Sequence, residues 1–370
     1  RKPGERIDWW YHNMGSVTGA GVAEITNQLE YDDDVAFQTV QKIYDLSRGL
    51  DARPWCLTAS FTHPHDPFVA RRRYWDLYEG APELEPPPAL AYDDMDPHSQ
   101  RLMDACDWRG LEVTPDDIRR SRQGYFANIS YVDDKIGEIL AALEATRQEA
   151  IVVFVSDHGE MLGRKGLWFK MNFFEGSARV PLMIAAPGLE PGLVQDPVST
   201  IDLTPTLCDL AGVSMAEVMP WTDGESLLPL AKGTARQSPV AMEYAAEGSI
   251  TPLVALRQGA WKYTRCLADP EQLFDLGNDP DEAVNLAADP RAAEVLAHFR
   301  KIADARWDLA AYDAEVRQSQ ARRWVVYEAL RNGSYYPWDY QPLRAASERY
   351  MRNHMDLNVL EESKRFPRGE

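Results

Sequence analysis

The sequence predicts an α/β fold: a doubly wound, mostly parallel sheet, followed by a smaller α+β domain that contains an antiparallel sheet. Up to about residue 235, apolar runs of strand length alternate with helical patterns, the order typical of parallel sheets. After that point, short strand-like runs are separated by turn signals, which is typical of antiparallel sheets. We therefore divide the chain into a main domain (1–235), a smaller domain (236–312) and a tail (313–370).

The first part of the main domain is read as one helix, one strand and two loops. A helix is expected to begin at Asp32, where three acidic residues precede apolar residues at helical spacing. A strand is expected over 55–61, ending in the loop His63-Pro64-His65-Asp66-Pro67. Residues 81–98 are rich in Pro, Asp and Glu, which predicts an exposed loop segment.

The second part of the main domain has clearer boundaries. A long helix is expected to begin at Thr114, because a capping residue is followed by a proline and by two acids in the first turn. The run 151–155 holds only β-branched and aromatic residues, which predicts a fully buried strand. A second strand is expected over 180–185, and a further helix is expected to open at Asp202.

The smaller domain and the tail differ from the main domain in their residue patterns. Strand-like runs at 240–244, 253–257 and 261–265, separated by turn signals, predict the antiparallel sheet. The tail is charged and aromatic, and we expect its large aromatic residues to form an oligomer contact rather than a ligand site. These residues are Trp324, Tyr335 and Trp338.

Composition narrows the class of protein. The net charge of −19 argues against nucleic-acid binding, which needs clustered Lys and Arg, and it suits a cationic small substrate, although solubility alone also explains acidity. No apolar run approaches the length of a membrane span. Four cysteines without paired spacing fit a reducing compartment, so we expect a cytoplasmic protein with no disulfide scaffold and no zinc ribbon.

The most informative motif is Ser156-Asp157-His158-Gly159, directly after the apolar run. In open α/β sheets, functional residues collect just beyond the carboxyl ends of such strands. Asp157 and His158 offer an oxygen and an imidazole ligand, and Lys170 adds a compact positive charge nearby. This set suits a metal ion that holds an oxyanion; the alternatives are a helix-capping turn and a surface lysine.

These motifs, taken in order, resemble the second half of a sulfatase of the alkaline-phosphatase-like superfamily. The shared features are the Asp-His-Gly turn, Lys170, Arg179-Val180-Pro181, residues 202–206 and residues 273–286. Longer stretches are similar to the choline-sulfatase group of that family, and the resemblance covers essentially the whole chain. These stretches are residues 9–13, 60–67, 168–177 and 318–368.

The resemblance implies roles for four residues. Asp157 and His158 would bind a divalent cation, Ca²⁺ as the usual family ion, with Mg²⁺ or Mn²⁺ as alternatives. Lys170 would bind a sulfate oxygen as a point charge. His65 would donate the proton to the leaving oxygen, with His63 as its local competitor.

The resemblance also implies a substrate, choline-O-sulfate, which would be hydrolysed to choline and sulfate. A quaternary ammonium group is recognised by aromatic faces and carboxylates. His12 and Asn13 lie in the region where the resemblance places substrate contacts. Glu247 is the expected carboxylate at the cation, with Glu243 second.

The tail of this group reaches toward an active site, either its own or that of a neighbouring subunit. Asp356 is therefore a further candidate for substrate binding, with Asn358 as the alternative. We expect a homo-oligomer, either a dimer or a tetramer. No nucleic-acid or membrane partner is expected.

One departure from the family pattern is important. Family members carry a Cys-x-Pro/Ala-x-Arg segment whose cysteine is oxidised to formylglycine, the nucleophile. None of the four cysteines here is followed by Arg four positions later. We expect this segment and the first acidic metal-binding cluster upstream of Arg1, and we expect the chain alone to be inactive. Two other functions stay open: another sulfatase or a phosphonate or phosphate-ester hydrolase of the same fold, and a non-catalytic truncated subunit.

Overall fold

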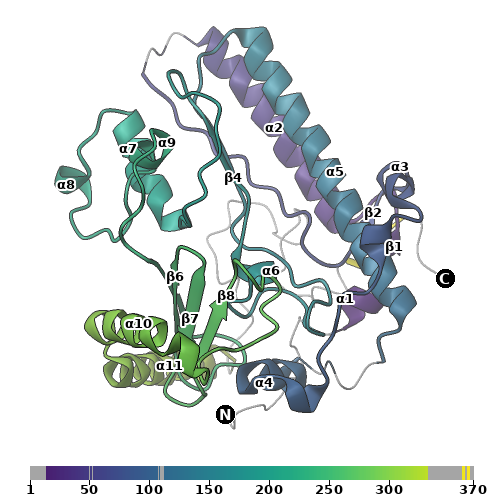
Figure 1. Ribbon diagram of the computed structural model, residues 1–370. Helices are drawn as coiled ribbons and strands as arrows, with labels where there is room; N and C mark the ends of the chain where they lie inside the picture. The colour runs from purple at the N-terminus through teal and green to yellow at the C-terminus, as the bar shows by residue number, and fades with distance from the viewer. Residues whose placement is uncertain are drawn as a thin grey trace.

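A computed structural model describes residues 14–49, 51, 53–106, 108, 112–331, 361–362 and 365–366. Figure 1 shows two long helices, α2 and α5, side by side along one edge of the molecule. The four-stranded sheet and helices α10 and α11 lie at the opposite end, and strand β4 and the short helix α6 lie between. This mixture of helices and sheets, with an antiparallel sheet toward the C-terminus, confirms the predicted class.

The α2–α5 pair carries the loops of the site. Helix α2 (Asn27–Arg48) is capped by Thr26, whose Oγ1 accepts a hydrogen bond from the Leu29 amide at 3.1 Å. The predicted start at Asp32 was therefore wrong, and Asp32 lies one turn inside the helix, fully buried. Helix α5 (Pro115–Thr146) begins as predicted, with a capping box between Thr114 and Asp117.

The strand predicted over 55–61 is not formed. This stretch has no regular secondary structure, because no described strand lies beside it to complete a ladder. The chain forms instead a short parallel pair of strands on either side of it, β1 (Gly21–Val22) and β2 (Val69–Ala70). Residues 81–98 contain short 3₁₀ turns and are exposed or partly exposed at most positions, but the buried side chains of Leu84, Met95 and His98 anchor them.

Strands β3 (Val152–Val155) and β4 (Leu182–Ala185) form an antiparallel pair, with Val152 opposite Ala185. The sequence pattern predicted parallel neighbours, but a parallel pair needs a crossover of a dozen or more residues, usually a helix. Between these strands the chain forms only the four-residue helix α6 (Glu175–Ala178). The predicted full burial of the strand was also wrong: β3 is half-buried, since no described strand pairs with its other edge.

The C-terminal sheet has the order β5-β6-β7-β8 and is antiparallel throughout. Its first three strands were predicted and are confirmed; the fourth was not identified as a strand. Helix α10 covers one face, where the rings of Tyr263 and Phe299 stack with centroids 5.8 Å apart. The elements are β5 (Val240–Tyr244), β6 (Leu253–Gln258), β7 (Trp261–Arg265), β8 (Gln272–Asp275), α10 (Ala293–Arg306) and α11 (Leu309–Arg331).

The remaining helices are short, and α7 opens just after Asp202 as predicted. They are α1 (Gly15–Thr18), α3 (Arg72–Trp75), α4 (Pro97–Ala105), α7 (Leu203–Leu210), α8 (Met215–Val218) and α9 (Leu228–Ala231). The largest core cluster joins Phe68, Trp168 and Phe174 to Phe274 of β8, so the main part and the C-terminal sheet share a core.

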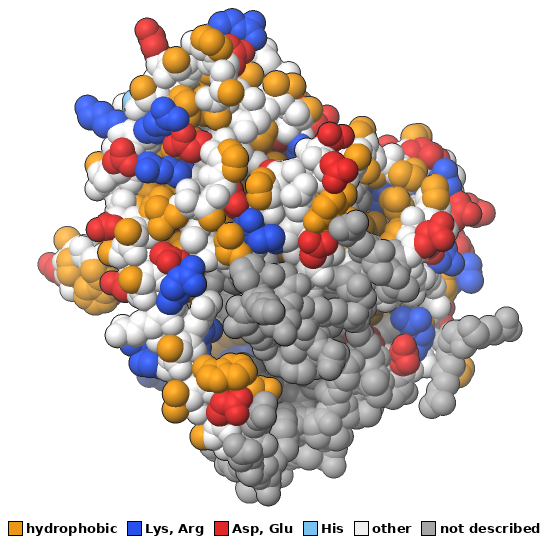
Figure 2. All heavy atoms as spheres, turned by 90° about the horizontal axis from the view of Figure 1, so that it is seen from below, with side chains coloured by type: hydrophobic (Ala, Val, Ile, Leu, Met, Phe, Trp, Pro, Cys, Tyr) orange, Lys and Arg blue, Asp and Glu red, His pale blue; other side chains and the backbone are white. Residues whose placement is uncertain are grey.

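Three observations concern the surface. None of the described helices combines the length and the apolar character that crossing a bilayer requires. On the face shown in Figure 2, acidic and basic side chains are interspersed with hydrophobic ones. Trp324 on α11 is half-exposed and contacts Tyr327, so its oligomer role stays a prediction; Tyr335 and Trp338 lie outside the described residues.

Candidate active site

Three predicted site residues from separate parts of the chain come together. Lys170 Nζ lies 2.6 Å from His65 Nε2. The ring of His158 lies edge-on to that of His65, with centroids 5.9 Å apart. One ammonium group and two imidazole rings therefore meet at the end of β3, where the sequence predicted the site.

The orientation of His65 is fixed by its second ring nitrogen. His65 Nδ1 lies 2.9 Å from the backbone oxygen of Asp66, which only accepts, so Nδ1 carries the proton in this arrangement. In a neutral ring Nε2 then accepts a hydrogen bond from Lys170. The side chain of His65 is 29% exposed, which leaves this pair open to a substrate.

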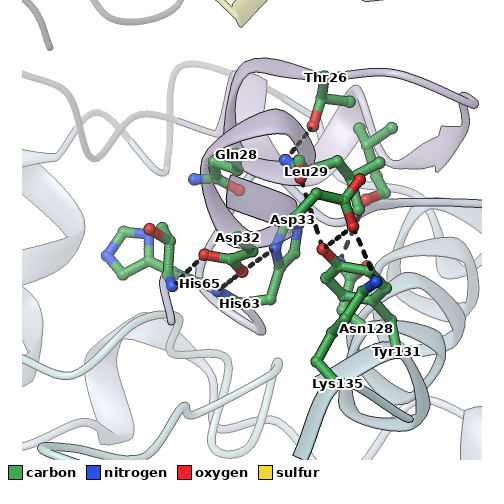
Figure 3. Close-up of polar contacts among 12 residues, drawn as sticks. Thr26, Gln28, Leu29, Asp32, Asp33, His63, His65, Asn128, Tyr131 and Lys135 are labelled. Atoms are coloured by element: carbon green, nitrogen blue, oxygen red, sulfur yellow. Dashed lines mark hydrogen bonds and ion pairs between the residues drawn. The ribbon is translucent and has the colours of Figure 1, made fainter. Parts of the chain in front are cut away.

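His63, the competitor of His65, is turned away from the site. Its ring is buried and its Nδ1 lies 2.6 Å from Asp32 Oδ2. Figure 3 shows the His63 ring directed at Asp32 and the His65 ring directed away from it. The structure therefore brings His65 to Lys170 and leaves His63 against helix α2.

The Asp157-His158 turn presents two donor atoms on one side. Asp157 Oδ2 lies 3.8 Å from His158 Nε2, and the Asp157 side chain is 86% exposed. His158 Nδ1 donates to the Gly159 backbone oxygen at 2.9 Å, so Nε2 is the available ligand atom. Burial lowers the pKa of His158, and the charge of Lys170 lowers it further. Both effects favour the neutral imidazole, the form that binds metals.

The donor set fits a divalent cation only in part. A carboxylate oxygen and an imidazole nitrogen on neighbouring residues are suitable ligands, but Ca²⁺ takes about six to eight oxygen ligands. In the part of the chain that the structure describes, no group of three or more His, Cys, Asp or Glu side chains is placed to hold a metal. Asp157 and His158 would account for only two ligands of such a site.

The loop that carries Lys170 is tied to this turn by a glutamate that the sequence reasoning missed. Glu160 Oε1 accepts hydrogen bonds from the amides of Phe169 at 2.6 Å and Leu162 at 3.1 Å. Burial raises the pKa of Glu160 to about 8. Its position directly after the Asp-His-Gly turn, next to the apolar pair Met161-Leu162, was the available signal.

Close backbone packing completes the tie. The Gly159 amide donates to the Ser177 backbone oxygen at 2.7 Å, and a Cβ on Gly159 would lie 2.2 Å from the Gly176 oxygen. Ser177 Oγ in turn donates to the Lys170 backbone oxygen at 2.6 Å. Position 159 therefore requires glycine because the two backbones approach so closely.

Glu247 is linked to the site through aromatic residues. Tyr244 donates its hydroxyl to Glu247 Oε2 at 3.0 Å, and its ring contacts those of His98 and Phe173. His98 Nε2 donates to the backbone oxygen of Met171, the residue after Lys170, at 2.7 Å. Glu247 is thus connected to the Lys170 loop indirectly, through Tyr244 and its edge-on ring contact with Phe173.

The other predicted substrate residues separate into two groups. Glu243 accepts a hydrogen bond from Trp307 Nε1 at 2.7 Å, a contact within the C-terminal part. The choice of Glu247 before Glu243 as the carboxylate at the cation stays a prediction. His12, Asn13, Asp356 and Asn358 lie outside the described residues, so their roles stay predictions.

Comparison with known families identifies the chain. Residues 5–213 match the sulfatase family, 163–306 match the C-terminal family of N-sulphoglucosamine sulphohydrolase, and 314–366 match the family described as choline sulfatase enzyme C terminal. The chain belongs to the sulfatase family. Sulfatases are sulfuric ester hydrolases, so the predicted enzyme class and the alkaline-phosphatase-like fold are confirmed.

Individual relatives agree with this assignment. Choline-sulfatase of Rhizobium meliloti (strain 1021) is 64% identical over 379 residues, which cover 100% of this chain and 74% of that protein. Arylsulfatase K of Danio rerio is 34% identical over 58% of this chain and 43% of its own length. Among solved structures, phosphonate monoester hydrolase SpPMH from Silicibacter pomeroyi superposes with a TM-score of 0.62 at 27% identity, over 74% of this chain and 60% of that one.

Sulfatases generally use a divalent metal and a formylglycine nucleophile. The residues four positions after the cysteines of this chain are Ser60, Gly110, Gly212 and Pro270. No Cys-x-Pro/Ala-x-Arg segment therefore occurs within these 370 residues. The formylglycine nucleophile is therefore not supplied by a segment of this kind within these residues.

Proposed function

We propose that the protein hydrolyses choline-O-sulfate to choline and sulfate. The observation that carries this proposal is the Lys170–His65 pair beside the Asp157-His158 turn, in a chain that is 64% identical to a choline-sulfatase over its whole length. Because the nucleophile segment is not among these residues, we further propose that the chain alone is inactive. The term holoenzyme is used below for this chain joined to a formylglycine-bearing segment.

Lys170 and His65 have different proposed roles at the sulfate group. The Lys170 ammonium, a strongly hydrated point charge in water, neutralises a sulfate oxygen as negative charge moves onto the leaving group. His65 delivers the proton that the departing alkoxide needs, since a simple alkoxide is a poor leaving group. In this step His65 begins as the imidazolium, passes its Nε2 proton to the leaving oxygen and becomes neutral. Nε2 can then accept a hydrogen bond from Lys170 Nζ, which lies 2.6 Å away and keeps its own charge.

Asp157 and His158 are proposed to hold a divalent cation, Ca²⁺ in preference to Mg²⁺ or Mn²⁺. Such an ion would supply further positive charge at the sulfate group. The lowered pKa of His158 supports this role, because it keeps the imidazole neutral and able to ligate.

Glu247 is proposed to balance the charge of the choline ammonium, with Tyr244 and Phe173 offering ring faces to its methyl groups. His12, Asn13 and Asp356 remain proposed substrate contacts. A homo-oligomer, a dimer or a tetramer, is proposed from the aromatic tail. A cytoplasmic location is proposed because the four cysteines are free, as a reducing compartment favours.

A second candidate is a phosphonate or phosphate-ester hydrolase. Similarity to the phosphonate monoester hydrolase SpPMH over 74% of the chain favours it among the alternatives. Sulfate and phosphonate monoesters are both tetrahedral oxyanions, so the same cationic groups serve either one.

The two candidates are separated by substrate competition. Sulfate release from choline-O-sulfate and alcohol release from a phenylphosphonate monoester are measured with the holoenzyme under the same conditions. We expect kcat/KM for choline-O-sulfate to be larger by about 10²-fold or more, a discrimination of about 3 kcal/mol. A preference for the phosphonate ester would contradict the first proposal and support the second. Sulfate release by the chain alone would contradict the proposal that it is inactive.

A further inference from the structure

The loop that carries His65 is fastened to helix α2 by one buried carboxylate. Asp32 accepts hydrogen bonds from the Thr62 amide at 2.7 Å, the His63 amide at 3.0 Å and His63 Nδ1 at 2.6 Å. The Asp32 side chain is 0% exposed. Figure 3 shows these bonds converging on it from the loop.

The same helix holds the other end of the loop. Gln28, one turn before Asp32, donates from Nε2 to the Asp66 backbone oxygen at 2.8 Å. That oxygen is also the acceptor of His65 Nδ1. Helix α2 therefore contacts the chain on both sides of His65: Asp32 binds residues before it, and Gln28 binds the residue after it.

We propose that Asp32 is a positioning residue for the proton donor His65, an inference that rests on the proposed function. Asp32 does not contact His65; it fixes the backbone from which the ring projects. Hydrogen bonds from N–H groups to an ionised carboxylate are about twice as strong as neutral ones, so three on one fully buried carboxylate define the path of the loop closely. Proton delivery depends on such placement, since functional groups must be held within about 0.5 Å of the productive geometry.

The neighbouring residue Asp33 makes a different set of contacts. Asp33 is also an ionised partner on α2, but it bonds to Arg71, Tyr131 and Lys135. These contacts join α2 to α5 and to the end of β2. The bonds themselves go to none of residues 62–66, although the ring of Tyr131 also packs edge-on against that of His63. Asp33 thus stabilises the helix pair, and it offers a matched control for the same chemical change.

The test compares two sulfate esters in the holoenzyme carrying Asp32→Asn. The amide keeps the shape of the carboxylate but loses its charge and turns an NH₂ toward N–H donors. For choline-O-sulfate, whose leaving group needs the proton, we expect kcat/KM to fall about 10–100-fold, as for supporting residues elsewhere. For 4-nitrophenyl sulfate, whose leaving group departs without it, the fall is expected to be less than about 3-fold, because general-acid assistance adds little there.

Two controls accompany this variant. Asp33→Asn is expected to change both substrates equally, and far-UV circular dichroism and thermal melting confirm that each variant is folded. If Asp32→Asn does not fold, Gln28→Met removes the second tie to the loop and is expected to show the same selective loss at smaller size. Equal losses on the two esters in Asp32→Asn, or in Gln28→Met where it stands in, overturn the proposal.

His65→Ala distinguishes the inference from the function beneath it. A selective loss on choline-O-sulfate in His65→Ala, together with an equal loss on both esters in Asp32→Asn, means that His65 is the donor and that Asp32 does not position it. If His65→Ala shows no selectivity, the proton-donor assignment fails and the role of Asp32 falls with it. Selectivity in both variants supports both.

Discussion

The two loops that meet at the site are anchored by opposite charges. The His65 loop is held by a buried carboxylate, Asp32, which accepts from backbone amides. The Lys170 loop is held by a buried ammonium, Lys262 of β7, which donates to the Phe173 backbone oxygen at 2.7 Å. The loops present different backbone groups to the interior, and each anchor has the complementary hydrogen-bonding character.

The anchors also differ in where they come from. Asp32 lies on a helix of the main part, close in sequence to its loop, whereas Lys262 reaches across from the C-terminal sheet. Lys262 also forms ion pairs with Glu175 at 3.0 Å and with Glu282. The placement of Lys170 is therefore coupled to the stability of the C-terminal sheet, and the placement of His65 is coupled to α2.

The largest effect is expected where the Lys170 loop meets the substrate. Lys170→Ala in the holoenzyme should lower kcat/KM about 10²–10³-fold, because a preorganised charge at the sulfate oxygens is lost. The fall should be of similar size for choline-O-sulfate and 4-nitrophenyl sulfate, since both present the same sulfate group. This pattern contrasts with the selective loss expected for His65→Ala.

Initial rates of sulfate release at several substrate concentrations measure the effect. Lys232→Ala, which removes an exposed lysine far along the chain, is the matched control and should leave both rates unchanged. A strongly selective loss in Lys170→Ala would mean that Lys170 acts on the leaving group instead of the sulfate oxygens.

The second-largest effect is expected on stability, when Lys262, which holds the Lys170 loop, is replaced. Lys262→Met leaves Glu282 and Glu175 without their buried partner, so the free energy of unfolding should fall by about 3–5 kcal/mol near pH 8. Burial raises the pKa of Glu282 above its ordinary value. A carboxyl with a raised folded pKa favours the folded state when protonated, so the deficit should shrink as the pH falls through that value.

Urea unfolding of the holoenzyme at about pH 8 and pH 5 measures this deficit. The control is the double variant Lys262→Met with Glu282→Gln, which removes the unpaired charge and should recover part of the loss at pH 8. A deficit in Lys262→Met that does not depend on pH would contradict the assignment to an uncompensated Glu282.

The smallest effect is expected at Glu247, the residue proposed to bind the cationic end of the substrate. Glu247→Gln should raise KM for choline-O-sulfate about 10-fold, in line with a cation site worth about 1–2 kcal/mol, and leave 4-nitrophenyl sulfate almost unchanged. Glu243→Gln is the matched control, because Glu243 bonds to Trp307 instead. Equal changes for the two esters in Glu247→Gln would remove Glu247 from the substrate site.

Sequence reasoning identified candidate site residues that the structure brings together, and it missed the residues that hold their loops in place. Asp157, His158 and Lys170 were found because they occur in a recognisable order after an apolar strand. Asp32 was taken for the start of a helix, since a run of three acids ordinarily marks an exposed first turn. The helix instead begins at Asn27, capped by Thr26 six residues before Asp32, and Asp32 lies on its buried face.

Contacts between distant segments could not be predicted from the sequence either. Nothing in the local sequence pairs Lys262 with Phe173, or Gln28 with Asp66, because these contacts join residues far apart in the chain. The resemblance favoured His65 over His63, but both histidines occupy the same proline-rich loop, and only the structure shows that His65 faces Lys170 while His63 faces Asp32.

By itself, the sequence determined the fold class, the antiparallel strands after residue 235 and the residues of the candidate site, because these follow from local periodicity and from residue types in a fixed order. Only the tertiary structure decided which histidine faces Lys170, that β3 and β4 run antiparallel, and that the buried charges of Asp32 and Lys262 anchor the two loops. The burial of a side chain and its hydrogen-bond partners depend on packing between segments remote in the chain, so local sequence patterns do not predict them.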